Sequence, residues 1–300
     1  MTRIICLRDD DTSFHTKYEE LAEGYGEFWG KIPVTLATVP FSHGSQQKIL
    51  EYEQIKGNKF EHVRKWEKNA SFELLTEYHK LHPIGENKDL VEKLKPFVKE
   101  KKVEIAQHGI SHRYNEKGAE MYYDNVGLLQ IRDGKEYLEK VFETEVNVFV
   151  PPSNTIDPRC GKYINKIGMD ILCSGSIRFR SLKEQILNLM YYPMDVFRFF
   201  KRKVIGKNPA IYSRCGIDFT GAPTFDAWKT VDEMYEKVID GLNRNNAVAI
   251  TTHYMLLNNL MSDNYEYRRK YQEFLARLSD LKDVEFVTAT EYIRRLKNRG

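Results

Sequence analysis

Short runs of apolar, β-prone residues recur along the whole chain and are separated by longer stretches with helical periodicity. Several of these runs are apolar at every position, a pattern typical of strands that are buried on both faces of a parallel sheet. This alternation predicts an α/β fold. The strand-like runs are Ile4–Leu7, Val34–Val39, Val103–Ala106, Val146–Val150, Met169–Cys173, Ala247–Thr252 and Val284–Val287.

Two of the intervening stretches carry clear helix signals. Asn87 is expected to cap a helix over residues 88–98, and Thr230 or a neighbour is expected to open another, each with apolar residues at helical spacing. Seven or eight β/α repeats favour a (β/α)7-8 barrel over an open doubly wound sheet, and no Gly-rich nucleotide signature follows the first strand. We therefore expect one barrel domain over residues 1–300, with insertions after strands two and five at residues 41–86 and 176–209.

Composition excludes several classes of function. The net charge of +3 over 300 residues is too small to predict a nucleic-acid partner. No stretch approaches the roughly 20 apolar residues that a membrane span requires. The N-terminus reaches a charged cluster after four apolar residues, unlike a secretory signal, so we expect a cytoplasmic location.

Polar residues follow three of the predicted strands, where a barrel places its active site. The first group is the acidic triplet Asp9-Asp10-Asp11, whose mutual repulsion a bound cation would relieve. His108 and His112 follow the third strand at i, i+4 spacing and could reach one metal ion. His253 ends a late strand, where an imidazole could protonate a leaving group. Each feature alone has a structural explanation, but their conjunction predicts a metal-dependent active site.

The order of these motifs resembles the polysaccharide deacetylases, carbohydrate esterase family 4 with NodB homology, in a divergent branch. That family has a paired Asp after strand one, then H-x-x-x-H, a loop with two prolines and a late histidine. The resemblance covers residues 1–14, 102–114, 146–157 and 246–255. The matching residues here are Asp10-Asp11, His108-x-x-x-His112, Phe149-Val150-Pro151-Pro152-Ser153-Asn154 and His253.

The resemblance implies that the (β/α)7-8 barrel is deformed. It also implies a hydrolase that removes an acetyl or other acyl group from an amino sugar or glycan precursor. It implies a divalent metal held by Asp11, His108 and His112, with Asp10 as general base and His253 as general acid. Zinc is the expected metal, with cobalt, nickel, iron and manganese as alternatives. Within the double-proline loop, we expect Pro152 and Asn154 to contact the substrate.

Two points of the resemblance leave alternatives open. Strand alternation sends Asp9 and Asp11 to one face and Asp10 to the other, which would make Asp9 the base, whereas the family pattern assigns Asp10. Where the family has an arginine that orients the base, this chain has Val150, and Arg8 is a candidate substitute. The alternatives are therefore a catalytically weak metal- or carbohydrate-binding relative and a hydrolase of a non-sugar amide. A two-carboxylate glycosidase is disfavoured by the two histidines beside the acidic cluster.

The second insertion contains a basic amphipathic segment at residues 182–207. Such a segment can lie on an anionic membrane surface, so we consider peripheral membrane contact, with a helix covering the barrel as the alternative. The oligomeric state and the identity of the sugar are not predicted by the sequence.

Overall fold

The computed structural model describes residues 2–44, 59–115, 118–123, 126–173, 176–177, 181–192, 211–215, 217–221, 230–258 and 265–298. The strands are β1 (Arg3–Thr12), β2 (Val34–Thr38), β3 (Phe41–His43), β4 (Leu81–Pro83), β5 (Val103–His108), β6 (Tyr114–Asn115), β7 (Gly118–Ala119), β8 (Val148–Val150), β9 (Thr155–Ile156), β10 (Asp170–Leu172), β11 (Ser176–Ile177), β12 (Ile211–Arg214), β13 (Ile217–Thr220), β14 (Ala247–His253) and β15 (Val284–Val287). The α-helices are α1 (Tyr18–Tyr25), α3 (Lys59–Asn69), α4 (Phe72–His79), α5 (Lys88–Lys99), α6 (Glu120–Tyr123), α7 (Leu128–Phe142), α8 (Pro158–Lys166), α9 (Leu182–Tyr191), α11 (Val231–Asn245), α12 (Tyr254–Leu257), α13 (Glu266–Ser279) and α14 (Ala289–Lys297).

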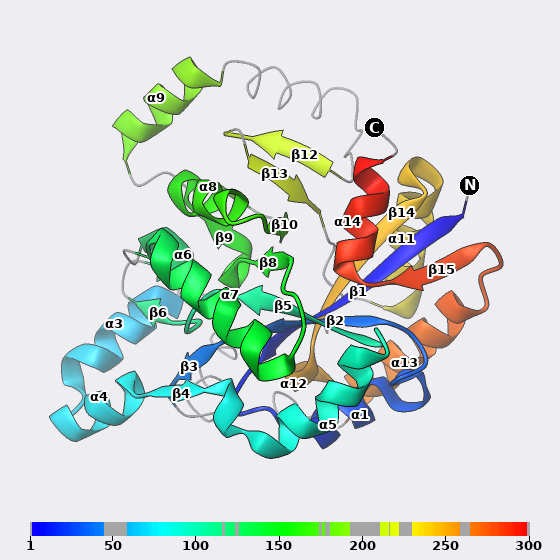
Figure 1. Cartoon of the computed structure of the whole chain (residues 1–300), viewed down its shortest axis with the longest axis horizontal. Coiled ribbons are helices and arrows are strands. Elements are labelled where there is room, and N and C mark those ends of the chain that lie inside the picture. The colour runs from blue at the N-terminus through cyan, green and yellow to red at the C-terminus, as the bar shows by residue number, and fades with distance from the viewer. Residues whose placement is uncertain are drawn as a thin grey trace.

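The central sheet has the order β12-β13-β10-β8-β5-β2-β1-β14, and all of its neighbours are parallel except β12 and β13. Strand β15 also pairs with β1. It lies along the same edge of β1 as β2 does, but it pairs with the first residues of β1, whereas β2 pairs with the later ones. Helices flank this sheet (Figure 1). The mostly parallel, barrel-like α/β architecture expected from the apolar runs is confirmed.

The sheet curls strongly enough for its two halves to face each other. The Arg8 guanidinium on β1 donates to the Leu172 carbonyl oxygen on β10 at 2.9 Å, although β2, β5 and β8 lie between these strands. The curled sheet therefore encloses an inner face, and polar side chains at the carboxyl ends of the strands converge there.

Two apolar layers hold the curled sheet. Outward side chains such as Leu7, Leu36 and Ile105 pack with α1, α5, α7, α11 and α13. Inward side chains such as Cys6, Ala106 and Ala249 pack with α14, whose Tyr292 and Ile293 are buried. The C-terminal helix thus fills the inner face beneath the site.

Local sequence signals explain where the main helices begin. The Asn87 side chain accepts a hydrogen bond from the Leu90 amide at the start of α5, as predicted. Thr230 caps the start of α11, within the predicted position, and forms a reciprocal capping box with Glu233 that was not predicted. The hairpin β12–β13 was not predicted from the sequence. The insertion at 41–86 contains β3, α3, α4 and β4 in its described part, and the described part of 176–209 contains β11 and α9.

None of the helices within the described ranges is both long and apolar enough to cross a membrane.

Candidate metal centre and active site

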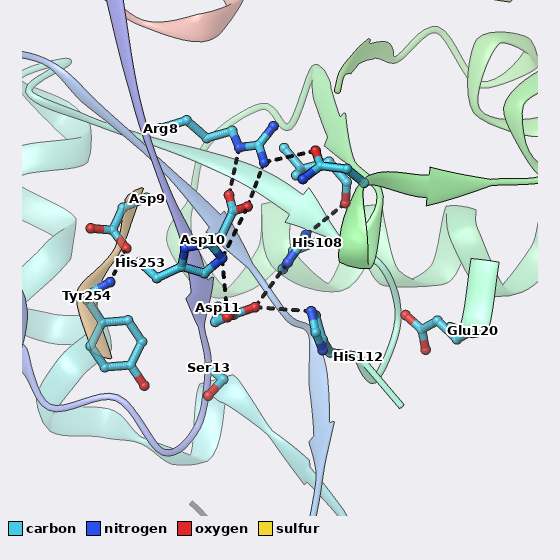
Figure 2. A network of polar contacts seen from close by, with 12 residues as sticks. Arg8, Asp9, Asp10, Asp11, Ser13, His108, His112, Glu120, His253 and Tyr254 are labelled. Carbon is cyan, nitrogen blue, oxygen red and sulfur yellow. Dashed lines mark hydrogen bonds and ion pairs between the residues drawn. The ribbon is translucent and has the colours of Figure 1, made fainter. Parts of the chain in front are cut away.

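The end of β1 brings two of the three aspartates into the enclosed space. Alternation along β1 places Ile4, Cys6, Arg8 and Asp10 on the inner face. Asp11 leaves this regular pattern: its φ is +74°, and the pairing of β1 with β2 shifts register between Asp9 and Thr12. This irregularity turns Asp11 inward next to Asp10 (Figure 2). The expectation that Asp11 shares a face with Asp9 was therefore wrong, because it assumed a regular strand.

The two histidines of the H-x-x-x-H motif lie on a tight turn after β5. Gly109 has φ +63° and His112 has φ +56°, so the chain reverses within the motif. The Nε2 atoms of His108 and His112 each lie 3.1 Å from the same Asp11 oxygen, Oδ1. Asp11, His108 and His112 thus form a group whose ligand atoms could hold one metal ion, as predicted.

The hydrogen bond on the far side of His108 explains why this group suits a cation. His108 Nδ1 lies 2.9 Å from the Val150 carbonyl oxygen, which can only accept, so Nδ1 carries the proton. In the neutral ring, Nε2 then presents a lone pair to the Asp11 carboxylate. Burial raises the pKa of Asp11, but His112 and His108 outweigh it and hold the pKa well below its usual value. Two acceptors at 3.1 Å require a proton or a cation between them, and the donor set fits a divalent metal.

The Asp10 carboxylate is clamped by Arg8 from the same strand. Arg8 Nε lies 2.7 Å from Oδ1 and Nη2 lies 2.6 Å from Oδ2, and both side chains are almost fully buried. Burial alone would raise the pKa of Asp10, but Arg8, followed by His108 and His253, lowers it below its usual value. Arg8 therefore contacts the candidate base directly, and its role as a substitute for the guanidinium missing at Val150 stays a prediction.

His253 completes the group from β14. Its Nε2 lies 4.0 Å from Oδ2 of Asp10 and 4.0 Å from Oδ2 of Asp11, and the ring is partly exposed. The parallel register pairs Asp10 with His253 directly, which explains why two residues far apart in the sequence meet. The predicted acid, base and metal ligands therefore lie in one group (Figure 2).

Asp9 points away from this group. Its carboxylate accepts hydrogen bonds from the Tyr254 amide at 2.8 Å and from the Tyr25 hydroxyl at 3.0 Å. Burial raises the pKa of Asp9 to about 7 despite these donors and the nearby His253. Of the two candidate bases, only Asp10 faces the metal ligands.

The double-proline loop lies beside the same group. Pro152 is buried within 2.5 Å of where a β-carbon on Gly109 would lie, and Asn154 accepts a hydrogen bond from Arg8 Nη2 at 3.2 Å. Both residues thus border the site, and their contact with a substrate remains a prediction.

Two buried residues beside the ligand turn were missed by sequence reasoning. Glu120 accepts hydrogen bonds from the amides of Ile110 and Ser111, and His43 Nδ1 lies 3.1 Å from the Ser111 carbonyl oxygen. The only available signal was the apolar setting of Glu120 between Ala119 and Met121. Nothing in the spacing of His43 points to the site.

A model of glycosyl hydrolase family 57 matches residues 15–300. The chain belongs to glycosyl hydrolase family 57. No curated protein is significantly similar to it. Among solved structures, a 4-alpha-glucanotransferase from Thermococcus litoralis is similar at a TM-score of 0.52 and 13% identity, over 98% of this chain and 40% of that one. The present chain therefore shares its fold with part of a much longer protein.

Carbohydrate esterase family 4 is also represented among the similar structures. The Xyl-CE4 domain of a multidomain xylanase from the hindgut metagenome of Trinervitermes trinervoides has a TM-score of 0.48 and 10% identity, over 98% of this chain and 91% of that one. A family 4 acetyl xylan esterase from Clostridium thermocellum, in complex with a cobalt ion, has a TM-score of 0.46 and 13% identity, over 97% of this chain and 91% of that one. The sequence motifs resemble carbohydrate esterase family 4, whereas the family model that matches the chain is that of glycosyl hydrolase family 57.

Proposed function

We propose that this protein is a metal-dependent hydrolase that removes an acetyl or other acyl group from an amino sugar or glycan precursor. One observation carries the proposal: the inward-turned Asp11, with His108 and His112, lies beside an arginine-clamped carboxylate and a partly exposed histidine. Three parts thus share one space: a set of ligands for a cation, a candidate base and a candidate acid.

The metal would be held by Asp11, His108 and His112, and zinc is the expected ion because it favours imidazole and carboxylate ligands with one position left open. When bound, such an ion polarises an acyl carbonyl and makes a coordinated water more acidic. Cobalt, nickel, iron and manganese remain alternatives for the same ligands.

Asp10 would act as the general base. Its lowered pKa keeps the carboxylate ionised, and the bidentate pair with Arg8 fixes its direction. Each oxygen retains a lone pair that can accept a proton from the attacking water. Arg8 thus orients the base and at the same time lowers its pKa.

His253 would act as the general acid. Its Nε2 faces both aspartates, and its partial exposure lets it meet a substrate atom as well. An amine is a poor leaving group until it is protonated, and an imidazole is the side chain that most often supplies that proton.

The family name points to hydrolysis of glycosidic bonds as a second candidate activity. That reaction uses two carboxyl groups on either side of the scissile bond, one acidic and one basic. At this site Asp10 is held by Arg8, and Asp11 lies between two imidazoles. We favour deacylation because neither carboxylate is in an environment that would keep it protonated.

An assay for both products separates these activities. Metal-loaded protein is incubated with N-acetylated amino sugars and their oligomers, and acetate and new reducing ends are both measured. We expect acetate release that depends on metal and falls by about 10²- to 10⁴-fold in Asp10→Asn. Reducing ends without acetate would favour glycosidic cleavage instead.

The two further alternatives from the sequence make different predictions in the same assay. A catalytically weak binding relative would hold metal and release no acetate. The absence of an arginine at position 150 motivates this alternative, and the guanidinium of Arg8 beside Asp10 argues against it. A hydrolase of a non-sugar amide would release acetate from simple amides in preference to amino sugars.

A second proposal concerns α9 in the later insertion. Leu182, Met190 and Tyr191 on this helix are more than 70% exposed, and the chain after it is rich in Lys and Arg through residue 207. Residues 193–207 lie outside the described residues. We propose peripheral contact with an anionic membrane, and absence of co-sedimentation with anionic liposomes at low salt would refute it. The single-domain organisation and cytoplasmic location remain predictions.

A further inference from the structure

The turn that carries His112 rests on a buried carboxylate from another element. We propose that Glu120, at the start of α6, is a positioning residue for the metal centre: it holds the backbone of residues 110–111 and thereby places His112 opposite Asp11. This inference rests on the metal site of the proposed function and adds a residue that no motif in the chain indicates.

Glu120 uses both carboxylate oxygens on this turn. Oε1 accepts from the Ile110 amide at 2.6 Å, and Oε2 accepts from the Ser111 amide at 3.0 Å and the Ser111 hydroxyl at 2.9 Å. Glu120 itself is 2% exposed. Charge-assisted bonds in such a buried setting are stronger than neutral ones, so the carboxylate holds the turn firmly.

The opposite side of the turn is held by β3 of the first insertion. The Phe41 amide donates to the Ile110 carbonyl oxygen at 3.1 Å. His43 Nδ1 lies 3.1 Å from the Ser111 carbonyl oxygen and must donate to it, because a carbonyl only accepts. The peptide groups around Ile110 and Ser111 are therefore fixed from two sides, with Glu120 binding the amides and β3 binding the carbonyls.

The turn needs this support because its own conformation is strained. Gly109 and His112 both have positive φ, which is unfavourable for a non-glycine residue such as His112. His112 follows Ser111 directly, so the orientation of the Ser111 peptide sets where the imidazole points. Loosening that peptide would let His112 relax and would move Nε2 away from its 3.1 Å approach to Asp11 Oδ1.

Glutamine provides the sharpest change at position 120. It has the size of glutamate, but in either orientation its amide nitrogen would present hydrogens to a backbone amide that itself donates. The side chain would keep its packing and lose at least one bond to the turn. The result should be a misplaced His112 without a cavity.

Glu104 supplies a chemically matched control at the other end of the strands. Its buried carboxylate accepts from the Ala289 amide at 2.6 Å, the Thr290 amide at 3.1 Å and the Thr35 hydroxyl at 2.8 Å, and it holds the start of α14. Glu104→Gln therefore breaks the same kind of contact far from the ligand turn. It should lower the melting temperature and leave metal affinity unchanged.

The experiment is a titration of metal-free protein with Co²⁺, followed by its visible absorption and by calorimetry. We expect Glu120→Gln to weaken cobalt binding by about 10- to 100-fold, the usual effect of losing an outer-sphere partner, and Glu104→Gln to bind within about twofold of wild type. Cobalt affinity in Glu120→Gln within about twofold of wild type would overturn the inference. So would an equal loss in both variants, since that would reflect general destabilisation.

Two further results keep the inference separate from the proposed function. If wild type binds no cobalt, the metal site itself fails, whatever Glu120 does. If Glu120→Gln does not fold, Ser111→Ala decides, because it removes one of the three donors and leaves the carboxylate in place. We expect its affinity to fall about threefold or more, and an unchanged affinity would overturn the role of Glu120.

Discussion

Arg8 and Asp10 lie two residues apart on β1 and form a bidentate ion pair inside the curled sheet, with Nε–Oδ1 and Nη2–Oδ2 distances of 2.7 and 2.6 Å. Both point inward because strand alternation places every second residue of β1 on that face. The same guanidinium reaches the Leu172 carbonyl oxygen and Asn154. One arginine thus connects the candidate base to the opposite wall of the barrel.

Arg8→Lys should therefore impair catalysis more than metal binding. Lysine keeps the charge but cannot form the planar two-bond contact, so Asp10 loses its fixed direction and its pKa rises. We expect acetate release to fall by about 10²-fold, with the acid limb of the pH–rate profile displaced to higher pH. Cobalt affinity within about twofold of wild type is the accompanying control. A rate that falls while the acid limb stays in place would contradict the assignment of Asp10 as the base.

His253→Ala should distinguish substrates by their leaving groups. An amine must be protonated to leave, whereas an alkoxide or phenoxide leaves more easily without an acid. Acetate release from an N-acetyl sugar should consequently fall by a larger factor than release from an activated O-acetyl ester on the same protein. Equal losses on both substrates would show that His253 does not act as the acid.

Asp9→Asn should alter how stability depends on pH. The pKa of Asp9 is about 7 in the folded protein and 3.8 for an unperturbed carboxyl. Between about pH 4 and pH 7 the folded state keeps a proton that the unfolded state has lost, so the free energy of unfolding declines as pH rises. The full effect is on the order of 4 kcal/mol and is absent in Asp9→Asn. Urea unfolding of metal-free protein at several pH values measures the difference, and parallel curves for the two proteins would refute it.

Gly109→Ala and Gly168→Ala form a matched pair for the ligand turn. Both glycines have positive φ, +63° and +78°, so alanine at either costs about 1 kcal/mol of backbone strain. A β-carbon at Gly168 meets nothing within 4 Å, whereas at Gly109 it collides with the Glu120 carboxylate and lies 2.5 Å from Pro152 Cγ. We expect Gly109→Ala to lower the free energy of unfolding of the metal-free protein by at least about 2 kcal/mol more than Gly168→Ala does. Similar losses of unfolding free energy in the two variants would mean that the turn is loosely packed.

Much of the fold could be predicted from local patterns, because the buried strands and the helix caps depend on neighbouring residues. The carboxylate pair, the two histidines and His253 were recognisable because each follows an apolar run. The hairpin β12–β13 was missed, and it is an edge feature whose short strands flank Cys215 at φ +57°. Such a turn leaves no strong periodic signal.

The rest of the site depends on contacts between distant segments. Asp11 turns inward only because β1 departs from regular pairing with β2, and a period-two pattern cannot reveal this. Glu120 and His43 reach the turn at 109–112 from other elements, so their roles follow from tertiary packing. Arg8 was a candidate in the sequence, but its approach to Asp10 required the strand geometry.

The most direct test of the account is the metal content of purified protein after reconstitution and gel filtration, measured by elemental analysis. Wild type is compared with the double variant His108→Ala, His112→Ala, and with the control double variant His62→Ala, His79→Ala, which removes two histidines of α3 and α4. We predict about one equivalent of divalent metal in wild type and control, and essentially none in the ligand variant. No metal in wild type, or equal metal in all three, would contradict the central claim that Asp11, His108 and His112 form a metal centre.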